Sequence, residues 1–322
     1  MRPAHRPRHF RPVISAVAVI DIGSNSIKAL LAQSTSDGTL HARYQRSIEA
    51  RISAGISQRE PRLTEDGLQR GLAAVQTLLT DLAPFQPDAT VLVATSAVRD
   101  ARNGDDFCAR VHAATGHTIR ILTGEEEATL IGRGLTCDPA LRDLRDFYVF
   151  DLGGGSLECL VFRHRELQRK LSLPLGCVRL TERFIPDPSA AVPPAAIAAI
   201  SAHVNASLET ASFAFQLPAD AVAVGTGGTL TTVRTIRAAR VNEDLEATDS
   251  LIPLGELIHL RDELSALPLE ERRRIGGLPP ARADVFPAAL ATLVAVAESG
   301  GLGAFRHSLY NLRWGLAAAA FD

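Results

Sequence analysis

The sequence predicts an α/β fold built from two related halves. Short apolar runs that suit buried strands alternate with helical segments along the chain. A strand, an Asp-x-Gly loop and a second strand occur in this order twice, first around Asp21 and again around Asp151. The 322 residues are enough for one large domain or two ordinary ones, and 46% apolar residues allow a sizeable core. We therefore expect an internal duplication with two α/β halves.

The first half opens with the continuous apolar run Val17–Ile20, which is typical of a buried strand. The polar segment Asp21–Ser26 separates it from a second apolar run, Ile27–Ala32, and so predicts a tight hairpin loop. A helix is predicted over Arg62–Ala83, with Thr64 as its candidate N-cap. The pattern then predicts a strand, a helix, a strand and a helix, at residues 90–94, 107–115, 118–122 and 123–134.

The second half repeats the opening of the first. Its predicted elements are a strand at 148–150, a loop at 151–156, a strand at 157–163, a helix at 194–215, a strand at 221–224 and a helix at 230–239. We predict that residues 254–321 are all helical, with helices at 254–264, 269–275, 280–298 and 309–321. The helix at 280–298 is apolar nearly all round, which indicates burial in the domain or in a dimer.

These elements predict a division of the chain into four parts. Residues 1–12 are basic and proline-rich and predict a disordered arm. The other parts are an N-terminal α/β domain at 13–125, a second α/β domain at 126–305 and a C-terminal helix at 306–322 that packs back on the first domain.

The composition excludes several classes of protein. A net charge of −2 with 22% charged residues excludes disorder of the whole chain and argues against a generically basic nucleic-acid binder. No apolar stretch is long enough for a transmembrane helix, so we expect no membrane partner. The run Val13–Ile20 is too short and lacks a cleavage site for a signal peptide. The four cysteines form no CxxC pair, which favours a reduced cytoplasm and structural thiols.

Three glycine-containing loops carry the candidate chemistry. In Asp21–Ser26, glycine and hydroxyl residues let backbone N–H groups approach a phosphate. The three glycines Gly153–Gly155 cost chain entropy, which makes sense where the backbone wraps an anion. Asp151 and Glu158 flank them, and two carboxylates beside a phosphate cradle suit Mg²⁺. Gly225–Thr229 lies at a strand–helix junction, where anions bind helix N-termini. Each loop taken alone is also compatible with a structural turn.

The acidic run Glu125–Glu127 opens a predicted helix, and the helix dipole explains two of its acids. The longer segment Thr123–Gly132 resembles the motif of the exopolyphosphatase/guanosine pentaphosphate phosphohydrolase (Ppx/GppA) family, in its short two-domain form. Segments at 18–26, 94–103, 149–158, 173–180 and 225–229 agree with it, so the resemblance spans residues 13 to about 315. The order of the three loops resembles the actin/Hsp70/sugar-kinase superfamily. This likeness implies a duplicated, ribonuclease H-like architecture of two domains around a cleft.

The resemblance assigns roles to individual residues. It implies that Glu127 is the catalytic base, that Arg99 contacts phosphate, and that Asp151 and Glu158 coordinate Mg²⁺ with Asp21 facing them. It further implies a phosphate-binding set composed of Gly23, Ser24, Asn25, Ser26, Lys28, Gly153, Gly154, Gly155, Ser156, Gly227, Gly228, Thr229 and Arg282. It also favours a homodimer, which the residue pattern itself does not.

The sequence departs from the family pattern near its C-terminal end. The family's Ser-Asp-x-Gly-Leu-Arg-x-Gly is kept at Ser308, Leu312, Arg313 and Gly315, but Leu309 replaces the acid and Asn311 the first glycine. This change puts in doubt how the last helix closes on the first domain. The additional helical region of longer members is missing, so we expect short polyphosphate or a nucleotide rather than very long polymers.

Four functions compete at this stage. The first is a Mg²⁺-dependent exopolyphosphatase that releases orthophosphate from inorganic polyphosphate. The second is hydrolysis of the 5′-γ-phosphate of guanosine pentaphosphate, and no residue decides between these two. The third is a non-catalytic regulator that binds an alarmone or polyphosphate, against which intact Glu127, Asp151 and Glu158 argue. The fourth is a phosphotransferase, for which we find no acceptor-substrate signature.

Overall fold

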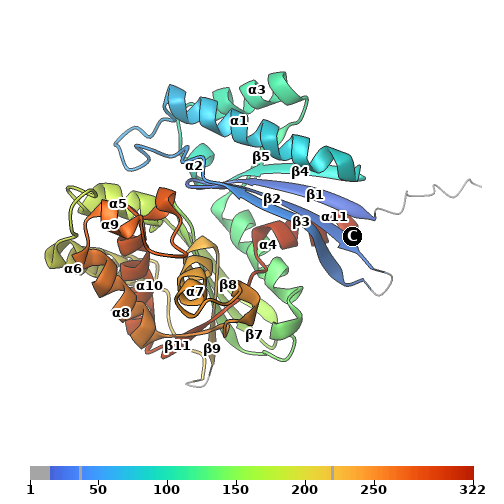
Figure 1. Cartoon of the computed structure of the whole chain (residues 1–322). Coiled ribbons are helices and arrows are strands. Elements are labelled where there is room, and N and C mark those ends of the chain that lie inside the picture. The colour runs from blue at the N-terminus through green and yellow to red at the C-terminus, as the bar shows by residue number, and fades with distance from the viewer. Residues whose placement is uncertain (1–14, 36–37, 219–220) are drawn as a thin grey trace, which may run out of the picture.

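The structure is a computed structural model, and it describes residues 15–35, 38–218 and 221–322. Two mixed β-sheets lie one above the other, and helices cover their outer faces (Figure 1). The predicted arm at 1–12 and the first two residues of the run Val13–Ile20 lie outside the described residues. Two helices that pack against each other, at residues 124–136 and 312–321, lie between the sheets.

The first sheet has the strand order β3-β2-β1-β4-β5. Its strands are β1 (Ala16–Ile22), β2 (Ile27–Ser34), β3 (Leu40–Ile48), β4 (Ala89–Ala94) and β5 (Ile119–Ile121). The outer face is covered by α1 (Glu65–Leu82) and α3 (Gly104–Thr115), and the turns η1 (Ala83–Phe85) and α2 (Ser96–Arg99) connect them to the sheet. The Thr64 side chain caps α1 by accepting the Gly67 N–H, as predicted.

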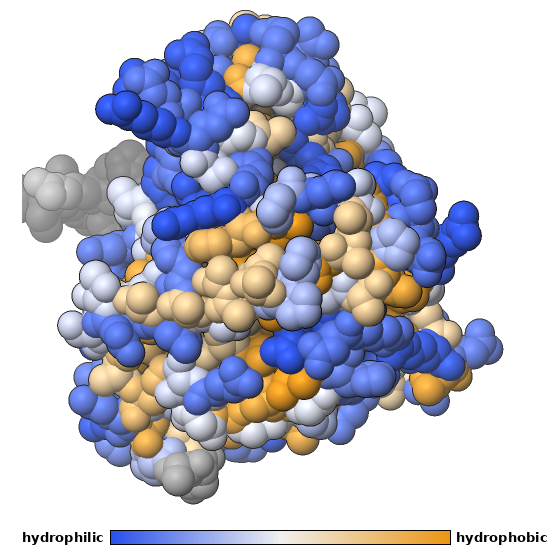
Figure 2. Space-filling view, turned by 90° about the vertical axis from the view of Figure 1, so that its left-hand side faces the viewer, coloured by the Kyte–Doolittle hydropathy of each residue, from blue (hydrophilic) through white to orange (hydrophobic). Residues whose placement is uncertain are grey.

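The second sheet has the order β10-β11-β9-β6-β7-β8. Its strands are β6 (Phe147–Leu152), β7 (Leu157–Arg163), β8 (Glu166–Leu173), β9 (Val222–Thr226), β10 (Leu251–Pro253) and β11 (Ala304–His307). Its helices and turns are η2 (Pro139–Leu141), α5 (Cys177–Phe184), α6 (Pro194–Thr210), α7 (Gly228–Val241), η3 (Leu245–Ala247), α8 (Leu254–Ala266), α9 (Leu269–Arg272), η4 (Pro280–Arg282) and α10 (Phe286–Gly300). Figure 2 views the face that carries α6 and α8, where apolar and small side chains gather in a band.

The predicted duplication is present in the strand topology. In each half, three antiparallel strands are followed by a fourth strand parallel to the first: β4 beside β1, and β9 beside β6. A fifth strand then adds in parallel to the fourth, as β5 and β11. This confirms the predicted α/β class and the actin-like two-domain architecture.

Helices α4 (Gly124–Thr136) and α11 (Leu312–Phe321) cross between the two sheets. The crossing is close because both helices carry glycine at the contact. A Cβ on Gly134 would lie 2.0 Å from the Asn311 carbonyl oxygen, and one on Gly315 would lie 1.8 Å from the Leu130 carbonyl oxygen. The last helix therefore packs on α4 and on the inner face of β1, although it follows the second half in sequence.

Several predicted elements need correction. Residues 254–321 are not all helical, because the four-residue strand β11 lies among them and pairs with β10 and β9. Strands β3 and β8 were not predicted, since their exposed faces are largely polar. The helix from Pro194 ends at Thr210, just before Ser212 adopts a left-handed conformation (φ 52°). The apolar helix α10 is buried against α5, α6 and α8, so its composition reflects burial within the domain.

Two further expectations concern the surface and the cysteines. In the ranges described here, no helix is long and apolar enough to cross a membrane. All four cysteines are free, with Cys159 and Cys177 buried and the other two partly buried. Cytoplasmic location and a homodimer stay predictions.

Candidate active site

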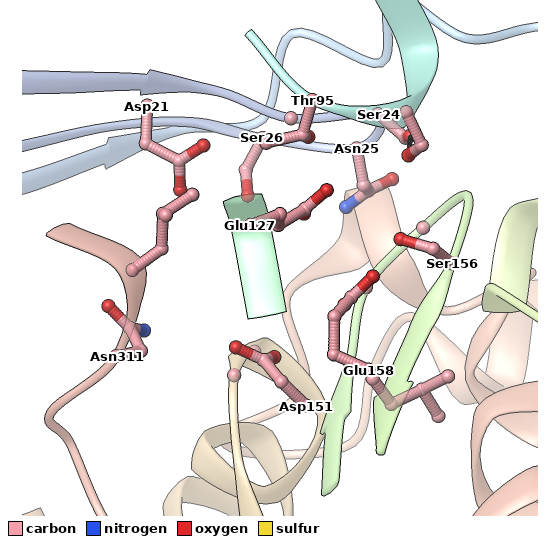
Figure 3. A pocket seen from close by; sticks show the side chains of 18 of the residues that line it. Asp21, Ser24, Asn25, Ser26, Thr95, Glu127, Asp151, Ser156, Glu158 and Asn311 are labelled. Atoms are coloured by element: carbon pink, nitrogen blue, oxygen red, sulfur yellow. Dashed lines mark hydrogen bonds between the residues drawn. The ribbon is translucent and has the colours of Figure 1, made fainter. Parts of the chain in front are cut away.

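A polar cavity of about 80 Å³ lies between the two halves, where the β1–β2 and β6–β7 hairpins face each other (Figure 3). The start of α4 enters it from one side, and the loop before α7 and the segment before α11 complete the wall. Its lining comprises Asp21, Gly23, Ser24, Asn25, Ser26, Lys28, Thr95, Ser96, Glu127, Ile131, Asp151, Leu152, Gly153, Gly154, Ser156, Glu158, Gly227, Gly228, Arg282, Asn311 and Leu312.

Both hairpin loops are closed by the same backbone bond. The Gly23 N–H donates to the Ser26 carbonyl at 3.2 Å, and the Gly153 N–H donates to the Ser156 carbonyl at 3.0 Å. Each loop therefore holds the segment after its aspartate in a tight turn. Such turns present backbone N–H groups to an anion.

The two loops touch because the second one is made of glycine. A Cβ on Gly154 would lie 2.7 Å from the Ser24 Cβ, and one on Gly155 would lie 2.8 Å from the Ser24 Oγ. Neither position has room for a side chain without movement of the opposing loop. The three glycines thus bring the two cradles into contact.

In the second hairpin, two carboxylates share one face. Asp151 and Glu158 are directly paired across β6 and β7, so their side chains lie side by side. Burial raises the pKa of Asp151 to about 6. Burial also raises the pKa of Glu158 well above its usual range, and the negative charges of Glu127 and Asp151 add to the effect. Ser172 on β8 donates its hydroxyl to Glu158 Oε1 at 2.8 Å.

In the first hairpin, the paired residues have opposite charges. Asp21 and Lys28 are partners across β1 and β2. Burial raises the pKa of Asp21, against the opposing effect of the Arg313 and Lys28 charges. Burial lowers the pKa of Lys28, and the nearby Arg313 lowers it further. Arg313 Nη1 lies 3.8 Å from Asp21 Oδ2, which is too far for a hydrogen bond.

The three acids at the start of α4 have three different environments. Glu126 forms a capping box with Thr123: its side chain accepts the Thr123 N–H at 2.8 Å, and the Thr123 hydroxyl accepts the Glu126 N–H at 3.2 Å. Glu125 is exposed, and Lys170 lies 3.7 Å from it. Glu127 is 6% exposed and lines the cavity. The helix end thus accounts for two acids and leaves Glu127 for the cleft.

Arg99 fixes one oxygen of Glu127. Its Nη1 donates to Glu127 Oε2 at 2.9 Å and to the Leu122 carbonyl at 3.0 Å. Burial raises the pKa of Glu127 to about 7, although the hydrogen bond from Arg99 opposes the rise. A carboxyl group that titrates near neutrality beside a polar cavity is suited to general base catalysis.

The third glycine loop, at Gly227 and Gly228, packs so tightly beside the cavity that neither position has room for a side chain. Gly227 has φ +88°, and a Cβ there would lie 2.2 Å from Asp151 Oδ1. A Cβ on Gly228, the first residue of α7, would lie 2.3 Å from Arg282 Nη1. The N-terminus of α7 therefore lies close to the Asp151 carboxylate at Gly227 and close to the Arg282 guanidinium at Gly228.

The residues present fit a magnesium ion. No group of three acidic, histidine or cysteine side chains converges as a ready-made metal site in the part of the chain that the structure describes. Mg²⁺ does not require one, because it keeps several waters and binds through one or two carboxylates and substrate phosphates. Asp151 and Glu158 supply two neighbouring carboxylates that open on the phosphate cradle.

All but three of the predicted site residues line the cavity. Arg99 lies behind Glu127 and contacts that carboxylate. Gly155 faces Ser96 in the contact between the loops. Thr229 is fully buried, and its hydroxyl donates to the Leu152 carbonyl at 3.5 Å.

Six lining residues were not predicted as site residues, among them the apolar Ile131 and Leu152. Thr95 and Ser96 follow β4, at the carboxyl end of a parallel strand where ligands of α/β sheets usually bind. That position was the available signal for them. Asn311 and Leu312 come from the altered C-terminal motif. Asn311 also caps α11, because its side-chain oxygen accepts the Arg313 N–H at 3.3 Å.

Comparisons with known proteins agree with this geometry. The model of the Ppx/GppA phosphatase family matches residues 31–319. The structure of the Aquifex aeolicus Ppx/GppA enzyme is 26% identical in sequence, with a TM-score of 0.76, and the match covers 95% of this chain and 99% of that one.

Two further structures share the fold. An exopolyphosphatase from Cytophaga hutchinsonii is 24% identical, with a TM-score of 0.85, and the match covers 95% of this chain and 98% of that one. An exopolyphosphatase-like protein is also 24% identical, with a TM-score of 0.86, and the match covers 96% of this chain and 98% of that one.

Proposed function

The chain belongs to the Ppx/GppA phosphatase family, and from that premise we propose that it is an exopolyphosphatase. The proposed reaction is hydrolysis of the terminal phosphoanhydride bond of inorganic polyphosphate, with release of orthophosphate. The observation that carries the proposal is Glu127, a buried carboxylate at the wall of a cavity that two phosphate cradles face. The resemblance to an exopolyphosphatase of Cytophaga hutchinsonii supports the choice of substrate.

Glu127 is assigned the role of general base. Arg99 holds Oε2 in place, so the carboxylate keeps a fixed orientation when water is bound beside it. Glu127 accepts a proton from the water as the water oxygen forms its bond to the terminal phosphorus. The bond from that phosphorus to the bridging oxygen breaks, and the shortened chain leaves as a phosphate anion. General base catalysis of this kind contributes about 10²–10⁴-fold to a rate.

The cradles are assigned the role of binding the terminal phosphoryl group. Phosphoryl transfer depends mainly on positioning and on neutralising the charge of the equatorial oxygens. The backbone N–H groups of the two hairpins, the hydroxyls of Ser26 and Ser156, and the Lys28 ammonium all reach the same cavity. These groups are held by backbone bonds, so they need little rearrangement when the substrate binds.

Asp151 and Glu158 are the residues that would hold Mg²⁺. The ion would supply positive charge to the phosphoryl oxygens. Burial raises the pKa of both carboxyl groups, and a cation held between them would favour their ionised forms.

The test measures orthophosphate release from short polyphosphate, long polyphosphate and guanosine pentaphosphate, each with Mg²⁺ and with EDTA. We expect Mg²⁺-dependent release from polyphosphate that falls by about 10²–10⁴-fold in Glu127→Gln. Glu125→Gln is the matched control, because this neighbouring acid is exposed and faces Lys170.

Each alternative predicts a different result. A strong preference for guanosine pentaphosphate would replace the proposed substrate with the nucleotide. Release that survives unchanged in Glu127→Gln would remove Glu127 from the mechanism. No release from any of the three substrates would overturn the proposal and favour a binding regulator.

A further inference from the structure

Arg179 on α5 belongs to the segment 173–180 that agrees with the family pattern, yet it does not line the catalytic cavity. Helix α5 faces α2 and the segment before α1 across the boundary between the two halves (Figure 1). Only 17% of the Arg179 side chain is exposed. A charged group that is mostly buried needs hydrogen-bond acceptors, so its partners show what this arginine holds together.

The three nitrogens of the Arg179 guanidinium bind three separate segments. Nε donates to the Gly155 carbonyl at 3.1 Å, Nη1 to the Ile56 carbonyl at 3.3 Å, and Nη2 to Asp100 Oδ2 at 2.6 Å. Gly155 belongs to the cradle of the second half, whereas Ile56 and Asp100 belong to the first half. A lysine, with a single nitrogen, does not offer this spread of donors. Arg179 therefore ties the second cradle to two segments of the first half.

The backbone at the start of α5 holds the same cradle. The Cys177 N–H donates to the Gly153 carbonyl at 3.0 Å, and the Val178 N–H donates to the Gly154 carbonyl at 2.9 Å. The carbonyl and the N–H of one trans peptide point in opposite directions, so the N–H groups of these peptides point away from α5. The start of α5 thus fixes the orientation of the second cradle, and Arg179 connects this support to the first half.

Asp100 continues the connection toward the catalytic base. Arg179 binds its Oδ2, and its Oδ1 lies 3.5 Å from Arg99 Nε. Arg99 Nη1 in turn donates to Glu127 Oε2 at 2.9 Å. Two arginines and two acids of alternating charge therefore form one row of contacts, which runs from α5 to the wall of the cavity.

Arg99 has two carboxylate neighbours in this row, and the position of its guanidinium depends on the balance between them. While Arg179 binds Oδ2, Asp100 keeps its other oxygen 3.5 Å from Arg99, which is longer than a good hydrogen bond. Without Arg179, Asp100 would be free to accept two N–H groups of Arg99, the bidentate geometry that arginine and carboxylate favour. Such a pair would draw Arg99 away from Glu127.

We propose that Arg179 is a positioning residue that binds Asp100 and thereby keeps Arg99 on Glu127 while the two halves are in contact. The catalytic part of this inference rests on the proposed function, because that is where Glu127 acts as a base. The row of contacts itself does not rest on it. Since the same guanidinium also binds Gly155, one side chain holds both the second cradle and the support of the base.

The test compares kcat and KM for orthophosphate release from polyphosphate in Arg179→Gln, Asp100→Ala and the double variant. Displacement of a catalytic group by about 1 Å costs about 10²-fold in rate, so we expect kcat of Arg179→Gln to fall about 10- to 100-fold. KM should change little, because Arg179 does not line the cavity. The double variant should recover part of the lost kcat, because Glu127 then has no competitor for Arg99. Arg179→Lys should lose less than Arg179→Gln, since its charge still attracts Asp100.

Glu182→Ala is the matched control on the same helix. Glu182 also joins the two halves, because its carboxylate accepts the N–H groups of Gly55 and Ser57 at 2.7 and 3.0 Å. It has no contact with Asp100 among those that the structure gives for it. Weakening of the boundary between the halves would lower kcat in this variant as well, whereas the positioning role predicts a much smaller loss than in Arg179→Gln.

Melting temperatures show which variants are folded. Wild-type kcat in Arg179→Gln, a double variant no faster than Arg179→Gln, or an equal loss in Glu182→Ala would overturn the positioning role. Failure of the proposed function would appear separately, as wild-type protein that releases no orthophosphate. The row of contacts is then tested by the melting temperatures alone: non-additive shifts of Arg179→Gln and Asp100→Ala support it, and additive shifts overturn it.

Discussion

The two glycine-containing hairpins have the same backbone pairing and differ in the charges of their side chains. In the first, Asp21 stands opposite Lys28, and in the second, Asp151 stands at the same register opposite Glu158. In both loops, the N–H of the first glycine donates a hydrogen bond to the carbonyl of the serine three residues later. One residue, a lysine in one copy and a glutamate in the other, places opposite charges in one hairpin and two acids in the other. This difference agrees with the proposed roles, phosphate binding for the first hairpin and cation binding for the second.

The loops also complement each other in shape. Ser24 and Asn25 of the first loop correspond to Gly154 and Gly155 of the second. The side chain of Ser24 occupies the space that Gly154 leaves free. Symmetric loops with side chains on both sides would not approach this closely. The difference between the copies is therefore what allows them to approach closely around one cavity.

The largest effect should come from making the second hairpin resemble the first in charge. Glu158→Lys places an ammonium beside Asp151 and removes one of the two carboxylates proposed for Mg²⁺. We expect orthophosphate release to fall at least about 10²-fold, because both the cation and the electrostatics of the cradle are lost. Release should also become insensitive to added Mg²⁺.

Glu166→Lys, on the exposed start of β8, is the matched charge control. Retention of Mg²⁺-stimulated release by Glu158→Lys would contradict the assignment of the cation to the second hairpin. Circular dichroism of both variants checks that the fold is kept.

A smaller effect is expected from disturbing the contact between the loops. Gly154→Ala adds a Cβ that would lie 2.7 Å from the Ser24 Cβ, so the loops must separate. Because displacement of catalytic groups by about 1 Å costs about 10²-fold in rate, we expect release to fall by about 10- to 100-fold. The double variant Ser24→Gly with Gly154→Ala removes the opposing Cβ and should recover part of the loss. Initial rates of the three variants measure this, and a Gly154→Ala protein with wild-type activity would show that the contact is not required.

The smallest effect is expected in the pH dependence set by the proposed general base, Glu127, which lies on α4 and on neither hairpin. Burial raises the pKa of Glu127 to about 7, so the protonated and inactive form persists to a higher pH than for an ordinary glutamate. Release should therefore rise by about tenfold per pH unit up to about pH 7 and then level off. Arg99→Gln removes the hydrogen bond that opposes this rise, and its profile should bend at a higher pH. A wild-type profile that is already flat at pH 5.5 would contradict the assignment of Glu127.

Local patterns predicted the parts of the molecule that local residues determine. The two hairpins could be predicted because each consists of apolar runs around a short polar loop. Glu127 was chosen among the three acids through the family resemblance, because the helix dipole alone does not say which two acids it explains. Strands β3 and β8 could not be predicted, since sheet-edge strands with polar faces lack the apolar pattern of a buried strand.

Contacts between distant segments could not be predicted from the sequence. The position of Arg99 behind Glu127 depends on how α2 meets the start of α4, and no spacing in the sequence encodes it. The same holds for the position of Arg313 near Asp21. It follows from the crossing of α11 with α4, which is a feature of the tertiary structure.

That helix crossing has a consequence for the order in which the protein can be made. The inner face of β1 is covered by α4 and by α11, so its burial needs residues near both ends of the chain. During synthesis the first sheet emerges early, but its apolar inner face stays partly uncovered until residues 312–321 have followed. Domains usually fold as units from the N-terminus, whereas here the half that is synthesised first is completed last. The second half, whose strands and outer helices are contiguous at 147–307, is free to fold before it and to serve as the surface on which the first half closes.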